Sequence, residues 1–77
     1  MVKVYYTPTC AYCASLKKFL RGKEIDFEEV DVSQDEAAFN EMVEKSGQLN
    51  VPVVEIDGQI ITGFDKEKLS QVLNINQ

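Results

Sequence analysis

The chain of 77 residues contains no histidine, no tryptophan and only two cysteines. A zinc site needs four ligands, so with two cysteines and no histidine a single chain completes such a site only with carboxylates. Two cysteines at close spacing also cannot staple a small secreted fold. The missing ligands disfavour a zinc site. In a reducing compartment, a close pair of cysteines is catalytic or metal-binding.

Long apolar runs and basic residues are scarce as well. No apolar run approaches the ~18 residues that a membrane-spanning helix requires. Eight lysines and arginines against thirteen acids give a net charge of −5, which argues against a nucleic-acid binder. The first residues run directly into strand-like sequence and have no signal-peptide pattern. We therefore expect a cytoplasmic protein with no membrane and no nucleic-acid partner.

The composition predicts one small globular domain over residues 1–77. An apolar content of 44% is too high for a disordered chain, and 77 residues leave room for one core. No repeat, low-complexity segment or linker divides the sequence. Because no exposed apolar stripe is evident, we expect this acidic chain to be a monomer.

The spacing of apolar residues and turn signals predicts the order β-α-β-α-β-β-α. The predicted strands cover residues 2–6, 25–32, 51–56 and 59–62. The predicted helices run from 11 to about 21, from the segment 33–36 to Gly47, and onwards from Asp65. Interleaved acids in 25–32 indicate a strand at a sheet edge, because a central parallel strand is buried on both faces.

Three local signals mark where these elements begin and turn. Ser33-Gln34-Asp35-Glu36 has the pattern of a capping box at a helix start. Asp57-Gly58 is typical of a tight β-hairpin turn. Asp65 is a suitable N-cap for the final helix, in which leucines and a valine follow helical spacing.

Cys10-Ala11-Tyr12-Cys13 lies between the first strand and the first helix. Positions i and i+3 share a helix face, so the two sulfurs can close into a disulfide ring or reopen with little backbone movement. Cys10 falls where the leading helix N–H groups are unpaired and the helix dipole is positive, which favours a thiolate. Cys13 shares the apolar stripe of Leu16 and Leu20. We predict Cys10 as the exposed attacking thiol and Cys13 as the shielded resolving thiol.

Four of the eight basic residues fall within seven positions, at Lys17, Lys18, Arg21 and Lys23. They complement the negative C-terminal end of the first helix in one interpretation. In the other, they form a docking patch for an acidic partner protein. The sequence leaves both interpretations open.

Three blocks of the sequence together resemble the small glutaredoxins: residues 6–13, residues 51–54 and Gly63-Phe64-Asp65. The resemblance implies an α/β thioredoxin-like fold, with a four-stranded mixed sheet and helices on both faces. It implies a dithiol–disulfide oxidoreductase whose catalytic residues are Cys10 and Cys13. It further implies disulfide-bearing proteins as partners, no bound cofactor, and glutathione as co-substrate.

The same resemblance implies a substrate and glutathione site. Tyr12 matches the tyrosine between the family's two cysteines. The peptide bond before Pro52 is expected to be cis beside the nucleophile, and the backbone of Val51 pairs with the substrate chain. Gly63 and Asp65 match the segment that holds the γ-glutamyl end of glutathione.

Three positions depart from the glutaredoxin pattern. Thr7 replaces a common lysine, Thr62 replaces the first residue of a glycine pair, and Lys66 replaces the second acid of an acidic pair. The segment around Phe64 instead resembles the Ser-Gly-Phe segment of the NrdH-redoxins, electron donors to ribonucleotide reductase that thioredoxin reductase reduces. The reductant of this chain, glutathione or thioredoxin reductase, therefore stays open.

Two further function classes compete with the dithiol enzyme. One is an iron–sulfur cluster shared by two protomers, each giving Cys10 with glutathione as co-ligand, an alternative with precedent among glutaredoxins. A non-enzymatic binding module is the other class, and it leaves the activated thiol unexplained.

Overall fold

The computed structural model describes residues 2–73, which form one mixed sheet and three helices. The elements in chain order are β1 (Val2–Tyr6), α1 (Ala11–Gly22), β2 (Glu28–Asp31), α2 (Glu36–Ser46), β3 (Val53–Ile56), β4 (Gln59–Thr62) and α3 (Lys66–Leu73). The sheet order is β2-β1-β3-β4. β2 runs parallel to β1, whereas the β1–β3 and β3–β4 pairs are antiparallel. The predicted α/β fold with a four-stranded mixed sheet is confirmed.

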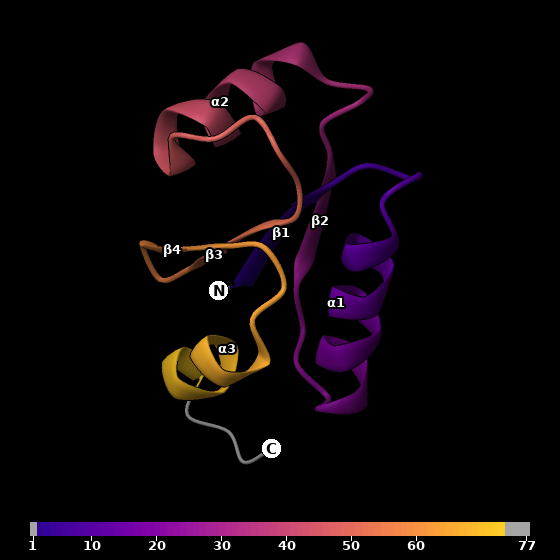
Figure 1. The fold of residues 1–77 in the computed structure, drawn as a ribbon, viewed down its shortest axis with the longest axis vertical. Coiled ribbons are helices and arrows are strands. Elements are labelled where there is room, and N and C mark those ends of the chain that lie inside the picture. The colour runs from indigo at the N-terminus through magenta and orange to yellow at the C-terminus, as the bar shows by residue number, and fades with distance from the viewer. Residues whose placement is uncertain (1, 74–77) are drawn as a thin grey trace.

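The helices cover both faces of the sheet, with α2 on one side and α1 and α3 on the other (Figure 1). Alternation along β1 sends Val4 to the α1–α3 face and Tyr5 to the α2 face. On the α1–α3 face the buried cluster consists of Val2, Val4, Leu16, Leu20, Val54, Ile56, Ile61 and Leu69. On the α2 face it consists of Tyr5, Val32, Met42 and Val53. In the part of the chain described, no helix combines the length and apolar character needed to cross a membrane.

β2 lies at a sheet edge, as its acids predicted, but it is shorter than expected. The strand spans Glu28–Asp31 rather than 25–32, because Ile25 and Phe27 pack against the α1–α3 cluster from outside the strand. β3 also begins two residues late, after Pro52, which has no N–H to give to a strand ladder.

The prediction of a capping box over residues 33–36 is wrong. The N-cap of α2 is Asp35, whose carboxylate accepts the Ala38 N–H at 3.1 Å. The hydroxyl of Ser33 instead donates to the carboxylate of Asp31 at 2.6 Å. Because Ser33 is engaged in this turn, the N-cap lies two residues later than the pattern suggests.

The remaining end signals behave as expected. α2 ends at Gly47, which adopts a left-handed φ of 71°. Asp57 and Gly58 have φ values of 48° and 88° and turn β3 into β4. The Asp65 carboxylate accepts the N–H of Lys68 at 3.1 Å and so caps α3.

A polar network connects α2 to β1 and β3. The buried Tyr5 hydroxyl donates to the Glu41 carboxylate at 2.7 Å, and the Lys3 Nζ lies 3.4 Å from the same oxygen. Lys45 lies 3.0 Å from both Glu41 and Glu55. The hydrogen bonds from Tyr5, Lys45 and Lys3 lower the pKa of Glu41 to about 2.

Candidate active site

Cys10 occupies the N-cap of α1, where β1 turns into the helix. Its backbone is extended, with φ −87° and ψ 114°, and its Sγ accepts the N–H of Cys13 at 3.1 Å. The backbone N–H of Cys10 donates to the Thr7 carbonyl at 3.2 Å and so closes the turn after β1. The half-buried sulfur therefore satisfies one of the helix N–H groups that otherwise lack a partner.

Cys13 lies on the buried face of α1 and is 1% exposed. Burial raises the pKa of its thiol to about 12, and the hydrogen bond with Cys10 acts in the same direction. The Thr7 backbone and the charge of Lys17 oppose this shift of the Cys13 pKa. Both cysteines are free thiols. The pair thus consists of a half-exposed sulfur at the helix tip and a buried, protonated sulfur one turn further on.

The loop before β3 brings a carbonyl beside the first sulfur. The peptide bond between Val51 and Pro52 is cis, as expected, and the Val51 carbonyl oxygen lies 3.9 Å from Cys10 Sγ. The Pro52 carbonyl accepts the N–H of Gly63 at 2.9 Å, where Gly63 adopts a left-handed φ of 75°. The hydrogen bond therefore connects the end of β4 to the loop that contacts Cys10. Gly63 lies more than 50 residues after Cys10 in the sequence.

The other predicted binding residues lie around this centre with different contacts. Tyr12 is 70% exposed on the first turn of α1. Phe64 packs edge-on against Phe19, with ring centroids 6.0 Å apart. It therefore contacts α1 at a position six residues after Cys13. The carboxylate of Asp65 is directed to the start of α3, as its N-cap contact shows. The contact between Phe64 and Phe19 was not predicted, since nothing local in the sequence pairs the two rings.

The cluster of basic residues on α1 is divided by its contacts. Lys17 and Arg21 lie 3.0 Å and 3.6 Å from the carboxylate oxygens of Glu29 on β2. The ammonium of Lys17 also lies 3.9 Å from the ring centroid of Tyr6. Two of the four basic residues are thus partners of the neighbouring strand, a pairing that neither interpretation of the sequence included.

The donor groups around the two cysteines bear on metal binding. Across residues 2–73, no cluster of three or more cysteine, aspartate or glutamate side chains is arranged to hold an ion. The site offers one accessible sulfur, a helix N-terminus directed at that sulfur, and a second sulfur within reach of it. This arrangement suits an exchange of disulfide bonds.

The chain has a four-stranded mixed sheet, a half-exposed sulfur at the N-cap of α1 and a buried sulfur one turn later. Together these features define a thioredoxin-fold dithiol protein. The family model described as Glutaredoxin matches residues 2–61. The chain belongs to the glutaredoxin family, and this is a family of thiol–disulfide redox proteins.

Similar proteins occur in several bacteria. A glutaredoxin-like 8.6 kDa protein of the rubredoxin operon in Clostridium pasteurianum is 44% identical over 73 residues, covering 95% of this chain and 97% of its own. Glutaredoxin 3 of Escherichia coli K12 is 38% identical over 64 residues, covering 83% and 77%. The glutaredoxin-like protein NrdH of Lactococcus lactis is 32% identical over 72 residues, covering 94% and 99%.

A solved structure supports the same fold. A single-residue mutant of the thioredoxin-like protein BC3987 superposes with a TM-score of 0.92 and 40% identity, covering 97% of this chain and 96% of its own. Among the relatives, both the glutaredoxin of Escherichia coli and the NrdH protein of Lactococcus lactis match most of the chain.

Proposed function

We propose that this chain is a dithiol–disulfide oxidoreductase that reduces protein disulfides or glutathione mixed disulfides through Cys10 and Cys13. The observation that supports it best is the difference between the two sulfurs. Cys10 Sγ is half-exposed and accepts a helix N–H at 3.1 Å, whereas Cys13 is 1% exposed and keeps its proton. This difference supports Cys10 as the sulfur that attacks the target and Cys13 as the sulfur that attacks only Cys10.

The reaction proceeds in two exchanges. The Cys10 thiolate attacks one sulfur of the target disulfide, the target S–S bond breaks, and the leaving thiolate takes a proton from solvent. Cys13 then gives up its proton and attacks the Cys10 sulfur, so that the mixed disulfide breaks and the target leaves as its second thiol. The target gains two electrons and two protons, and the enzyme is left with a Cys10–Cys13 disulfide.

The surroundings of Cys10 support a site for an extended target chain. The carbonyl of Val51, 3.9 Å from the sulfur, is an acceptor for a backbone N–H of the target. Pro52 and Gly63 hold this loop in place through their 2.9 Å hydrogen bond. Tyr12, two residues after Cys10, offers an exposed aromatic ring on the first turn of α1. We assign these residues to substrate binding, with glutathione as the small co-substrate.

Two cysteine variants test the proposal. Cys10→Ser should abolish reduction of a small disulfide, because no other accessible thiol exists within residues 2–73. Cys13→Ser, the matched control, should still form the first mixed disulfide with a protein target and accumulate it, which intact mass spectrometry detects. Full turnover by Cys10→Ser would refute the proposed function.

A second candidate is an NrdH-redoxin-like donor to ribonucleotide reductase that thioredoxin reductase recycles. Thr7, Thr62 and Lys66 stand where glutathione-binding residues are common, and the NrdH relative covers 94% of the chain. Each reductant system is supplied separately with NADPH: glutathione with glutathione reductase, or thioredoxin reductase. NADPH consumption only with thioredoxin reductase would exclude the glutathione-dependent role, and consumption only with glutathione would exclude the NrdH-like one.

A further inference from the structure

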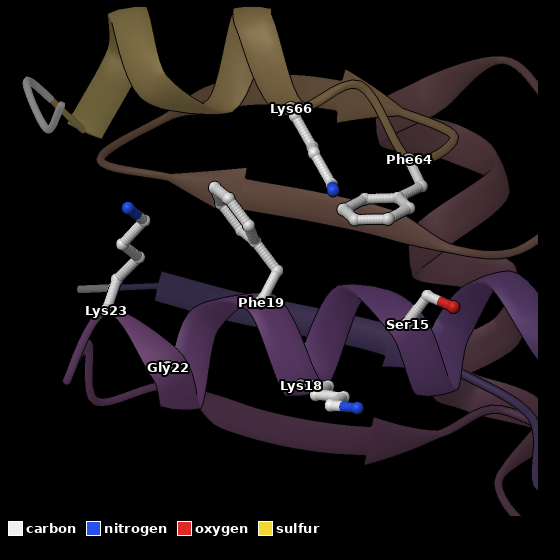
Figure 2. A pocket seen from close by; sticks show the side chains of 7 residues that line it. All are labelled: Ser15, Lys18, Phe19, Gly22, Lys23, Phe64 and Lys66. Atoms are coloured by element: carbon white, nitrogen blue, oxygen red, sulfur yellow. The ribbon is translucent and has the colours of Figure 1, made fainter. Parts of the chain in front are cut away.

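A groove of about 490 Å³ lies between α1 and the start of α3. Two phenylalanines, Phe19 and Phe64, and three lysines, Lys18, Lys23 and Lys66, belong to its lining. Figure 2 shows the two rings between the helices, with Lys23 and Lys66 on the same side as the rings and Lys18 at the opposite margin of α1. The volume falls within the range of ordinary ligand pockets.

The groove is basic although the chain as a whole carries a net charge of −5. None of the groove-lining side chains is acidic. The Lys66 ammonium lies 5.8 Å from the Phe64 ring centroid, and that of Lys23 lies 6.0 Å from the Phe19 ring centroid. Within residues 2–73, Lys18 and Lys66 form no ion pair with an acid, in contrast to Lys17, whose partner is Glu29. Three cations on an aromatic surface are complementary to carboxylates next to apolar side chains.

We propose that this groove docks an acidic segment of the protein whose disulfide Cys10 attacks. The inference rests on the proposed function, since it describes how a target of that same site is chosen. The carboxylates of the segment meet Lys18, Lys23 and Lys66, and its apolar side chains cover the two phenylalanine rings.

The groove is continuous with the thiol site. Phe64 directly follows Gly63, whose N–H is bonded to Pro52 beside Cys10. Along α1, Lys18 and Lys23 follow Cys10 by eight and thirteen residues, which is about 12 Å and 20 Å at ~1.5 Å per residue. An extended peptide advances ~3.3 Å per residue, so the acids should lie about four to six residues from the target cysteine.

Two disulfide peptides test this preference. Both carry the same disulfide, and one has aspartates and glutamates four to six residues away where the other has asparagines and glutamines. We measure kcat/KM for each at low and at high ionic strength. An exposed ion pair of about 0.5 kcal/mol contributes about twofold, so three should together favour the acidic peptide by roughly tenfold at low salt. The preference should shrink at high salt, because screening weakens exposed pairs.

Two double variants separate the groove from overall charge. K18Q/K66Q leaves Lys23 in the groove and should lower the ratio between the two peptides from roughly tenfold to about twofold. R21Q/K68Q removes the same charge from exposed positions outside the groove and should keep the ratio. Because both peptides share one disulfide, the ratio is insensitive to any general change in thiol reactivity.

The groove proposal and the proposed function fail in different ways. Equal use of the two peptides by the native protein would overturn the groove proposal, as would an equal loss of preference in both double variants. An effect of K18Q/K66Q confined to a glutathione mixed disulfide would also overturn it, since the groove would then serve the co-substrate. If the native protein reduces neither peptide nor a small neutral disulfide, the proposed function itself is wrong.

Discussion

Alkylation by iodoacetamide should distinguish the two cysteines of the folded, reduced protein. The reagent attacks thiolates, and burial raises the pKa of Cys13 from an ordinary 9.0 to about 12. At pH 7 the thiolate fraction is then about 10⁻⁵, against about 10⁻² for an unperturbed thiol, so ionisation alone slows Cys13 about 1,000-fold. Its 1% exposure slows the reaction further. Cys10 is half-exposed and should react first.

Mass spectrometry of the intact protein and its peptides provides the measurement. We expect one adduct, located on Cys10, in the folded state and two adducts after unfolding in guanidinium. Cys10→Ser is the control. It replaces the sulfur in the hydrogen bond that is the second cause of the raised Cys13 pKa, but it leaves the burial that is the first cause. Cys13 should therefore still react slowly in that variant.

The reasoning is refuted if both cysteines of the folded protein are labelled at similar rates, or if Cys13 is labelled before Cys10. Either result would show that the second sulfur is not shielded. The assigned order of attack and resolution would then have no structural support.

Three further predictions concern stability. Glu41 has a pKa of about 2 in the fold against an ordinary 4.5, so its contribution is complete above pH 4.5 and is lost as the pH falls towards 2. Urea unfolding across this range should show a steeper loss for the native protein than for Glu41→Gln; parallel profiles would contradict the shift. Leu20 is fully buried, and Leu20→Ala should lower the free energy of unfolding by about 2–5 kcal/mol, whereas a loss below ~1 kcal/mol would mean that the α1–α3 cluster is not tightly packed. Gly63 and Gly22 both have open space where a methyl group would go, but only Gly63 has a positive φ, of 75°. Gly63→Ala should therefore cost about 1–2 kcal/mol, and Gly22→Ala should be neutral or stabilising by up to ~1 kcal/mol in thermal unfolding; equal effects would exclude φ as the cause.

Local patterns in the sequence were sufficient for the element order and for the placement of the first strand and the hairpin. β2 was assigned to an edge because its acids cannot be buried on both faces, and the sheet order bears this out. The contrast in burial between Cys10 and Cys13 also followed from local information, since one turn of helix determines which side chain faces inward. Short-range competition between hydrogen bonds was harder to predict: Ser33 bonds to Asp31 at 2.6 Å and leaves the cap of α2 to Asp35.

The sequence by itself determined the cysteine pair, its place at a helix start and the order of the elements around it, because each depends on residues within one or two turns. Residues close in sequence do not determine what surrounds the pair: the resemblance to the glutaredoxins implied the Val51-Pro52 peptide beside Cys10, and the tertiary structure decided the contact. The Val51 carbonyl reaches Cys10 across 41 residues, because the strand order brings the loop before β3 next to the start of α1. The tertiary structure also gives two sequence neighbours different surroundings, since Lys17 pairs with Glu29 whereas Lys18 belongs to the groove lining. Adjacent residues on a helix point about 100° apart, so one meets the strand and the other meets the groove.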